Sequence, residues 1–362
     1  MRLLVLGGTE FAGRAVVAAA LARGWDVTVF NRGTRPVPEG VRSLVGDRTA
    51  AGGLAALETG GTDRTDRTDR TDRTDRTAGT GRTDGADGAA ERWDVVVDTW
   101  AAAPRAVRDT ARLLRDRVDR YVYVSSCSVY AGPPAPGYDE SAPLVEGDPD
   151  ADDVPYPQAK RGGELAVLDA FGAERSLFVR AGLLLGPWEN VDRLPWWLRR
   201  IDEGGPVLAP GPRDTPLQYL DIRDLAAWTL DAAGAGLSGP YNLAGATGHA
   251  TMEEFLTACA RVTGSDAELR WTDARTVLDA GIEPWTELPV WVPREELPEL
   301  YHTVYGLSVD RALAAGLRCR PVAETVADTW EWMRTEDPAR PRRAPRRTRG
   351  LERGKEARVL GL

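Results

Sequence analysis

The sequence predicts an α/β fold, with a doubly wound parallel sheet followed by a smaller C-terminal lobe. Three observations lead to this prediction. Short apolar runs alternate with helical stretches, a glycine-rich turn follows the first run, and tryptophan becomes frequent in the second half of the chain. Strands covered by helices on both faces are expected as continuous apolar runs of this kind.

The chain opens with a strand–turn–helix–strand unit. Residues 3–6 and 27–30 are apolar runs expected as strands, residues 7–13 hold the glycine turn, and residues 14–23 suit a helix. Gly7 permits a tight turn and Gly13 lets the helix pack on the strand. The helix N-terminus would then offer its N–H groups to a pyrophosphate. This pattern favours a Rossmann-type dinucleotide site over an ordinary βα turn.

Glu10 departs from that pattern, because it stands where the middle glycine of such turns usually falls. A carboxylate beside a pyrophosphate would repel it. We therefore expect the Glu10 side chain to point away into solvent.

The following elements continue the alternation. Strands are expected at residues 41–45, 93–98, 121–126 and 177–180, a helical turn at 54–58 and a helix at 105–117. Residues 218–226 are expected as a strand that opens a helix, and a short strand covers 241–243. Helices are expected at 252–262 and 322–333. Most tryptophans of this half are expected in the core, and some could line a pocket for a flat or sugar-like ligand.

A composition change interrupts the first half. Residues 62–77 repeat Thr-Asp-Arg, and polar, glycine-rich sequence continues to about residue 90. Few apolar side chains are present to offset the entropy of ordering this segment. This composition predicts a disordered insertion over about residues 59–92.

The predicted domain organisation has three parts. Residues 1–186 form the dinucleotide-binding Rossmann domain, and residues 187–335 form mainly a substrate-binding lobe, with 206–233 partly returning to the Rossmann core. Residues 336–362 form a basic, Pro/Arg-rich tail that we expect to be solvated or loosely packed.

Composition excludes several classes of protein. The net charge of −9 and the pI near 5.1 argue against a general nucleic-acid binder. Three distant cysteines and two histidines make neither a disulfide framework nor a zinc site. Neither a signal peptide nor an apolar run of membrane-spanning length is evident, so we expect a cytoplasmic protein without membrane contact.

The motif Tyr156-x-x-x-Lys160 carries the predicted chemistry. On a helix, the two residues share one face. The lysine cation favours the phenolate, so the tyrosine could exchange a proton near neutral pH. Asp152 and Asp153 suit a helix cap, with Pro155 and Pro157 in the first turn, while Gly162 and Gly163 would let another backbone come close.

Ser126 lies at the end of the predicted fifth strand. Ligands of doubly wound sheets bind beyond the carboxyl ends of the strands. The Ser126 hydroxyl could therefore hydrogen-bond a substrate carbonyl while Tyr156 exchanges the proton. A serine without function in a loop is the alternative.

Together these motifs resemble the short-chain dehydrogenase/reductase superfamily, in the extended and atypical branches labelled NAD-dependent epimerase/dehydratase. The resemblance covers about residues 1–335. The turn at residues 7–14 and Asn31-Arg32-Gly33 are most similar to an atypical branch with isoflavone-reductase-like members, whose plant relatives include chloroplast stem-loop RNA-binding proteins.

The resemblance implies roles for individual residues. The catalytic serine, tyrosine and lysine of the family carry over to Ser126, Tyr156 and Lys160. Ala181 departs from the family, since many extended members have proline there. The implied cofactor-binding residues are Gly7, Thr9, Glu10, Phe11, Gly13, Asn31, Arg32, Asp47 (at the adenine), Trp100, Ala101, Tyr156, Lys160, Gly182 and Leu183.

The predicted function is an NAD(P)-dependent oxidoreductase acting on a small organic or sugar-like substrate. The alternatives are a nucleotide-sugar epimerase or dehydratase with tightly bound NAD and a non-catalytic RNA-binding relative. After the second strand no acid precedes Glu39, whereas Arg32 and Arg35 could bind a 2′-phosphate, so NADP(H) is preferred and NAD(H) stays open. A small-molecule substrate is the expected partner, and a homodimer is left open.

Overall fold

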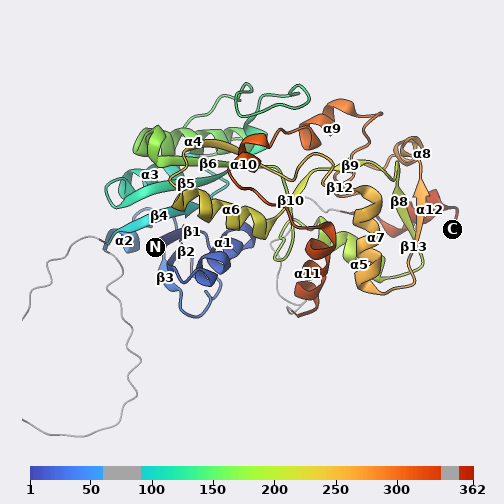
Figure 1. The fold of residues 1–362 in the computed structure, drawn as a ribbon, viewed down its shortest axis with the longest axis horizontal. Coiled ribbons are helices and arrows are strands. Elements are labelled where there is room, and N and C mark those ends of the chain that lie inside the picture. Colours follow the sequence, from blue (N-terminus) through green and yellow to red (C-terminus); the bar gives the residue numbers. More distant parts are fainter. Residues whose placement is uncertain (60–90, 336–349) are drawn as a thin grey trace, which may run out of the picture.

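The computed structural model describes residues 1–59, 91–335 and 350–362. The triplet-repeat insertion and residues 336–349 of the basic tail therefore lie outside the described residues. The first lobe is built on a seven-stranded parallel sheet with the order β11-β6-β5-β4-β1-β2-β3 (Figure 1). The strands are β1 Arg2–Leu6, β2 Asp26–Asn31, β3 Arg42–Val45, β4 Trp93–Asp98, β5 Val118–Ser126, β6 Ser176–Ala181 and β11 Gly239–Leu243.

Both faces of this sheet are buried, which explains the apolar runs. Alternate residues of β1 enter different cores: Leu3 and Val5 face α1 Phe11–Ala22 and α6 Ile222–Gly234. Leu4 and Leu6 face the other layer. That layer consists of α2 Ala55–Thr59, α3 Pro104–Leu114 and α4 Tyr156–Phe171. The predicted doubly wound parallel sheet is confirmed.

A second lobe with its own apolar core follows (Figure 1). Three small two-stranded sheets, β7–β10, β9–β12 and β8–β13, lie in this half of the chain. Its elements are β7 Leu183–Leu185, α5 Leu194–Asp202, β8 Pro206–Pro210, β9 Pro216–Leu217, β10 Tyr219–Asp221, β12 Ala250–Thr251, α7 Met252–Thr263, β13 Glu268–Thr272, α8 Ala274–Asp279, α9 Pro298–Tyr305, α11 Val322–Thr335 and α12 Arg353–Leu360. Helix α10 Asp310–Ala314 instead packs against β11 of the large sheet.

The chain returns from the second half to the Rossmann sheet through α6 and β11. α6 packs against α1, and β11 pairs with β6 at the edge of the sheet. β8 instead pairs with β13 in the C-terminal lobe. Within the segment 206–233 that was expected to return in part, α6 thus packs on the Rossmann core, whereas β8 lies in the C-terminal lobe.

The end of the chain is packed, and the prediction of a loosely packed tail is wrong for residues 350–362. Helix α12 contacts β8, and Leu351 is buried in the core of the C-terminal lobe. The Glu356 carboxylate accepts hydrogen bonds from Arg200 Nε at 2.8 Å and from the Leu208 amide at 2.9 Å. The basic composition of the tail did not indicate that one of its acids, Glu356, would be buried and paired with the buried Arg200.

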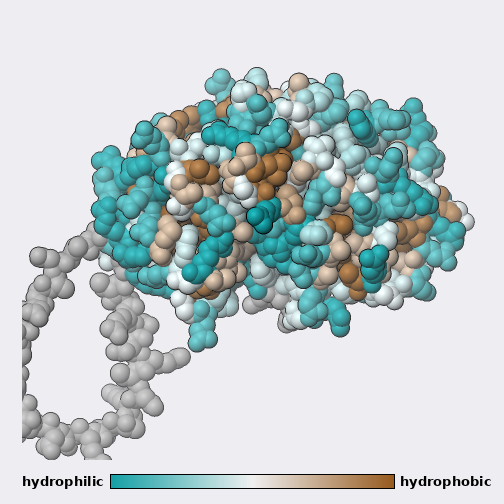
Figure 2. All heavy atoms as spheres, in the orientation of Figure 1, coloured by the Kyte–Doolittle hydropathy of each residue, from teal (hydrophilic) through white to brown (hydrophobic). Residues whose placement is uncertain are grey.

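Hydrophilic residues cover most of the visible surface. The face drawn in Figure 2 shows hydrophobic residues only in small scattered groups. Across residues 1–59, 91–335 and 350–362, no helix has the length and apolar character needed to cross a membrane.

Candidate active site

The glycine turn after β1 brings α1 very close to the sheet. Gly7 has a φ of +100°, and a Cβ on Gly13 would lie 2.4 Å from the Gly7 carbonyl oxygen. Any side chain at Gly13 would therefore push the helix away from the turn. Because the start of α1 makes no side-chain cap hydrogen bond, its free N–H groups fit a bound pyrophosphate.

Glu10 does not point freely into solvent, so that prediction is wrong. Its carboxylate accepts a hydrogen bond from Asn190 Nδ2 at 3.0 Å and forms an ion pair with Arg35 at 3.2 Å. Two partners distant in sequence hold the negative charge. This explains how an acid is accommodated where glycine is usual.

The last residue of β2 and the turn after β3 offer polar groups for the adenosine of a nucleotide. Asn31 Oδ1 accepts a hydrogen bond from the Gly33 amide at 2.7 Å, while Asn31 Nδ2 is buried and has no partner among the described residues. Asp47 is oriented by the Thr49 hydroxyl and amide, and these hydrogen bonds lower its pKa. An unsatisfied buried donor fits a bound nucleotide that would complete its hydrogen bonding.

Tyr156 is the first residue of α4, as the motif requires. Its neighbour Pro155 occupies the cap position without a side-chain hydrogen bond, so the predicted Asp152 or Asp153 cap is wrong. Asp152 instead pairs with Arg105 on α3. Tyr156 is 40% exposed, whereas Lys160, one turn later, is buried and lies 6.0 Å from the centre of the Tyr156 ring.

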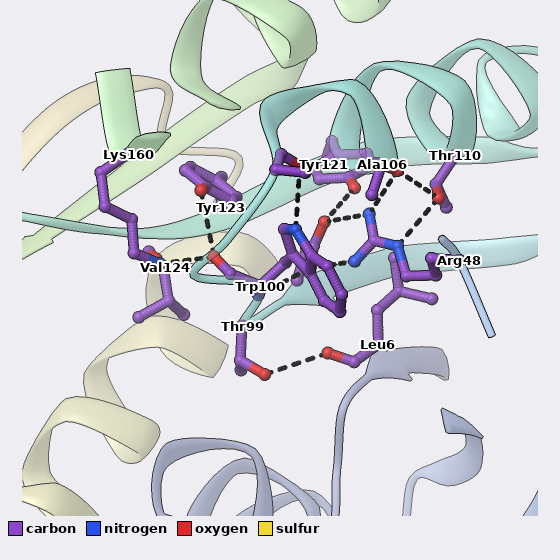
Figure 3. A network of polar contacts seen from close by, with 12 residues as sticks. Leu6, Arg48, Thr99, Trp100, Ala106, Thr110, Tyr121, Tyr123, Val124 and Lys160 are labelled. Atoms are coloured by element: carbon purple, nitrogen blue, oxygen red, sulfur yellow. Dashed lines mark hydrogen bonds and ion pairs between the residues drawn. The ribbon is translucent and has the colours of Figure 1, made fainter. Parts of the chain in front are cut away.

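Two backbone carbonyls hold the Lys160 ammonium. Lys160 Nζ donates to the carbonyl oxygen of Trp100 at 2.6 Å and to that of Val124 at 2.7 Å (Figure 3). Burial lowers the pKa of Lys160 to about 8, against the attraction of Asp98 and Glu164. α4 can approach β5 this closely because residue 163 is a glycine. A Cβ atom at this position would lie only 2.4 Å from the Tyr123 hydroxyl.

A buried ion pair lies beneath the Trp100 turn. Arg48 donates to both carboxylate oxygens of Asp98, at 2.7 and 2.9 Å, and Tyr121 donates to Asp98 at 2.6 Å (Figure 3). The Trp100 amide also donates to Asp98, at 2.9 Å. Burial raises the pKa of Asp98, but the Arg48 guanidinium outweighs this and holds it below its usual range.

Sequence analysis missed the role of Arg48 and Asp98. A signal was available, because Asp98 ends an apolar strand that is buried on both faces. A buried carboxylate needs a cationic partner. Nothing local indicates that the partner is 50 residues earlier, directly after Asp47.

Ser126 is buried at the end of β5, opposite Ala181 in the register with β6. Its hydroxyl accepts a hydrogen bond from the Ser128 amide and donates one to the Ser128 hydroxyl, both at 3.1 Å. These bonds cap the short turn of residues Cys127–Val129. A local structural role is thus evident, and its contact with substrate stays a prediction.

The remaining predicted cofactor residues differ in accessibility. Thr9 and Phe11 are partly buried in the turn, and Ala101 is exposed beside Trp100. The Gly182 amide donates to the Leu243 carbonyl at 2.8 Å, and Leu183 packs in the core of the C-terminal lobe. Their contact with a nicotinamide stays a prediction.

The turn, the Tyr156–Lys160 pair and the parallel sheet together form the arrangement that the resemblance to the short-chain dehydrogenase/reductase superfamily implied. The model of the NAD dependent epimerase/dehydratase family matches residues 3–244. The chain belongs to that family.

Individual relatives are distant. The chloroplast stem-loop binding protein of 41 kDa b of Arabidopsis thaliana is 23% identical over 268 residues, which are 73% of this chain and 63% of that protein. The chain thus spans less than two thirds of the length of this curated relative.

Solved structures with the same fold include UDP-glucose 4-epimerase of Thermus thermophilus in complex with NAD. It has 20% identity and a TM-score of 0.57, and the match covers 93% of this chain and all of that one. The Bordetella bronchiseptica enzyme WbmH in complex with NAD+ has 15% identity and a TM-score of 0.62, over 92% and 98% of the two chains.

Proposed function

We propose that the protein catalyses hydride transfer at an alcohol or carbonyl carbon, with Tyr156 as the general acid/base. The observation that carries this proposal is the buried Lys160 ammonium, fixed by the Trp100 and Val124 carbonyls one helical turn from Tyr156. A nearby cation stabilises the phenolate and makes the tyrosine useful at neutral pH. A bound nicotinamide would accept or supply the hydride.

The residues divide the remaining tasks. Tyr156 moves the proton to or from the substrate oxygen. Lys160 has three N–H donors, of which two are used by carbonyls, so one is left for a ribose hydroxyl. Ser126 orients the substrate oxygen.

Two reaction outcomes fit this chemistry. In a net oxidoreductase the cofactor is consumed stoichiometrically, whereas an epimerase or dehydratase regenerates it within each cycle. Solved structures with this fold carry the names of nucleotide-sugar epimerases, which supports the second outcome as an alternative. Measuring cofactor turnover in solution beside product formation separates the two.

NADP(H) is the proposed cofactor of the net oxidoreductase. Arg32 is exposed and its charge acts on Asp47, whereas Arg35 is paired with Glu10. Arg32 is thus the better-placed arginine for a 2′-phosphate, which a guanidinium binds through charge-assisted hydrogen bonds. The net charge of −9 supports the proposal of a small-molecule partner rather than a nucleic acid.

The catalytic proposal is tested by Tyr156→Phe, which removes one hydroxyl. Turnover should fall by about 10²–10⁴-fold, with nucleotide binding and unfolding free energy nearly unchanged. Lys160→Met should be similarly damaging and should also weaken nucleotide binding. Wild-type turnover in the Tyr156→Phe enzyme would refute the mechanism.

A further inference from the structure

Glu10 joins the glycine turn to the stretch of chain that enters the C-terminal lobe. It occupies the cap position of α1, yet its side chain makes no cap hydrogen bond with the helix. Its carboxylate instead accepts a hydrogen bond from Asn190 Nδ2 at 3.0 Å and pairs with Arg35 at 3.2 Å. Asn190 lies 180 positions later in the chain, shortly before α5. The carboxylate thus leaves the first amides of α1 to a nucleotide and binds a distant segment.

A second contact with the same segment lies one turn further along α1. The Arg14 guanidinium lies over the ring of Trp188, 4.9 Å from its centre, in a cation–π contact. Trp188 has a φ of 67°, in the left-handed region that non-glycine residues rarely adopt. Such a conformation persists where the surrounding structure enforces it. Residues 188–190 are therefore held against α1 at two points.

Glu189, between these two points, fastens the segment to the C-terminal lobe. Its buried carboxylate accepts hydrogen bonds from the amides of Arg193, at 2.8 Å, and Leu194, at 3.2 Å, at the start of α5. Movement of residues 188–190 away from α1 would have to break these hydrogen bonds or carry the start of α5 along. The two contacts with α1 therefore connect the glycine turn to the lobe itself.

We propose that the contacts of Glu10 with Asn190 and of Arg14 with Trp188 form a latch beside the diphosphate of the dinucleotide and set the rate at which the nucleotide enters and leaves. Glu10 and Arg14 flank the first three residues of α1, whose amides would hold the diphosphate. The latch rests on the proposed function in taking the glycine turn as the nucleotide site.

A latch has a kinetic signature of its own. Both contacts are made between groups of the protein and neither requires the nucleotide. Loss of one contact should therefore make opening easier whether or not nucleotide is bound, so entry and exit accelerate by the same factor and the equilibrium affinity is preserved. A residue that binds the nucleotide directly would instead change the affinity.

The test measures rates and affinities separately. Entry of NADPH and of NADH is followed by stopped-flow fluorescence, exit by displacement with excess NADP+ or NAD+, and Kd by calorimetry. Asn190→Ala leaves every charge in place and should raise both rates about tenfold, the scale of a lost hydrogen bond to a charged group, with Kd within about twofold of wild type. Trp188→Leu, which removes the cation–π contact, should raise both rates about threefold.

A double-mutant cycle assigns the effect to the Glu10–Asn190 contact. In a Glu10→Ala background, Asn190→Ala should lose most of its effect, because the two residues act through one hydrogen bond. Glu253→Ala is the matched control for Glu10→Ala, since the Glu253 carboxylate also pairs with an arginine, Arg213, at 3.2 Å, but on α7. This control should leave both rates unchanged. If Asn190→Ala does not fold, Trp188→Leu decides.

Wild-type exchange rates in Asn190→Ala, or equal effects of that substitution in both backgrounds, would overturn the latch. A faster exit with unchanged entry and a weaker Kd would make Asn190 a ligand of the nucleotide and overturn it as well. Absence of nucleotide binding by wild type would reject the proposed function and the latch together. Retained turnover in Tyr156→Phe would reject only the catalytic proposal, because that substitution leaves both latch contacts in place.

Discussion

Lys160 Nζ donates a 2.6 Å hydrogen bond to the carbonyl oxygen of Trp100. The amide of the same tryptophan donates to Asp98, which is paired with Arg48. One residue of the turn after β4 thus connects the proposed catalytic lysine to a buried ion pair. We therefore expect the position of Lys160 to depend on that pair.

Asp98→Asn tests the contribution of this ion pair to stability. The variant keeps the size of the side chain but leaves Arg48 as a buried cation without its counter-charge. We expect a loss of about 3–5 kcal/mol in the free energy of unfolding, measured by denaturant titration. Asp116→Asn, at an exposed ion pair with Arg115, should change it by less than about 0.5 kcal/mol. Equal effects of the two substitutions would contradict the assigned role.

Gly163→Ala tests the contact between α4 and β5. Alanine normally stabilises a helix by about 1 kcal/mol relative to glycine. Here the new methyl group would lie 2.4 Å from the Tyr123 hydroxyl, so we expect a loss of about 1–3 kcal/mol together with reduced turnover. Gly354→Ala in α12, where the nearest atom is 3.7 Å away, should be neutral or stabilising. A stabilised Gly163→Ala protein would count against this packing.

Glu189 should give the stability a pH dependence. Burial raises the pKa of Glu189 from 4.5 to about 7. Between pH 4.5 and about pH 7, Glu189 is protonated in the folded protein but ionised in the unfolded chain. The stabilising contribution of Glu189 is therefore fully present below pH 4.5 and is lost as the pH rises to about 7.

Glu189→Gln removes this titration. The unfolding free energy of the variant minus that of wild type should therefore increase between pH 4.5 and pH 7, by up to roughly 3 kcal/mol. Denaturant titrations of both proteins at several pH values measure the difference. Parallel profiles would show that Glu189 does not titrate in this range.

Glu356→Ala tests the packing of the C-terminal helix. The substitution leaves Arg200, which is buried, without its carboxylate, and we expect about 3–5 kcal/mol of lost stability. Glu352→Ala serves as the control, since that side chain makes no cap hydrogen bond. A stability change near zero for Glu356→Ala would mean that α12 adds little to the lobe.

Arg32→Ala tests the cofactor preference. NADPH binding should weaken by about 1.5–3 kcal/mol, the scale of a lost hydrogen bond to a charged group, while NADH binding changes little. Arg35→Ala should have the smaller effect on NADPH, because Arg35 is paired with Glu10. Titration of both nucleotides against the three proteins measures this; equal wild-type affinities would rule out the preference for NADP(H).

Features that depend on local sequence were predicted well. Strands buried on both faces have to be apolar, so β1, β4 and β5 were readable as runs, and the glycine turn was readable because Gly7 and Gly13 meet a steric requirement. The four-residue spacing of Tyr156 and Lys160 likewise follows from the helix period. In each case the physical constraint acts within a few residues of chain.

Tertiary structure alone decided what those residues contact. Nothing in the sequence couples Arg48 to Asp98, Glu10 to Asn190, or Glu356 to Arg200, because such pairs are joined by folding across long separations without any periodic pattern. The predicted cap of α4 failed for a local reason: the helix begins at Tyr156, so Pro155 takes the cap position and Asp152 and Asp153 lie too early in the chain. Sequence determined which elements form and which chemistry they carry; packing determined where each charge finds its partner.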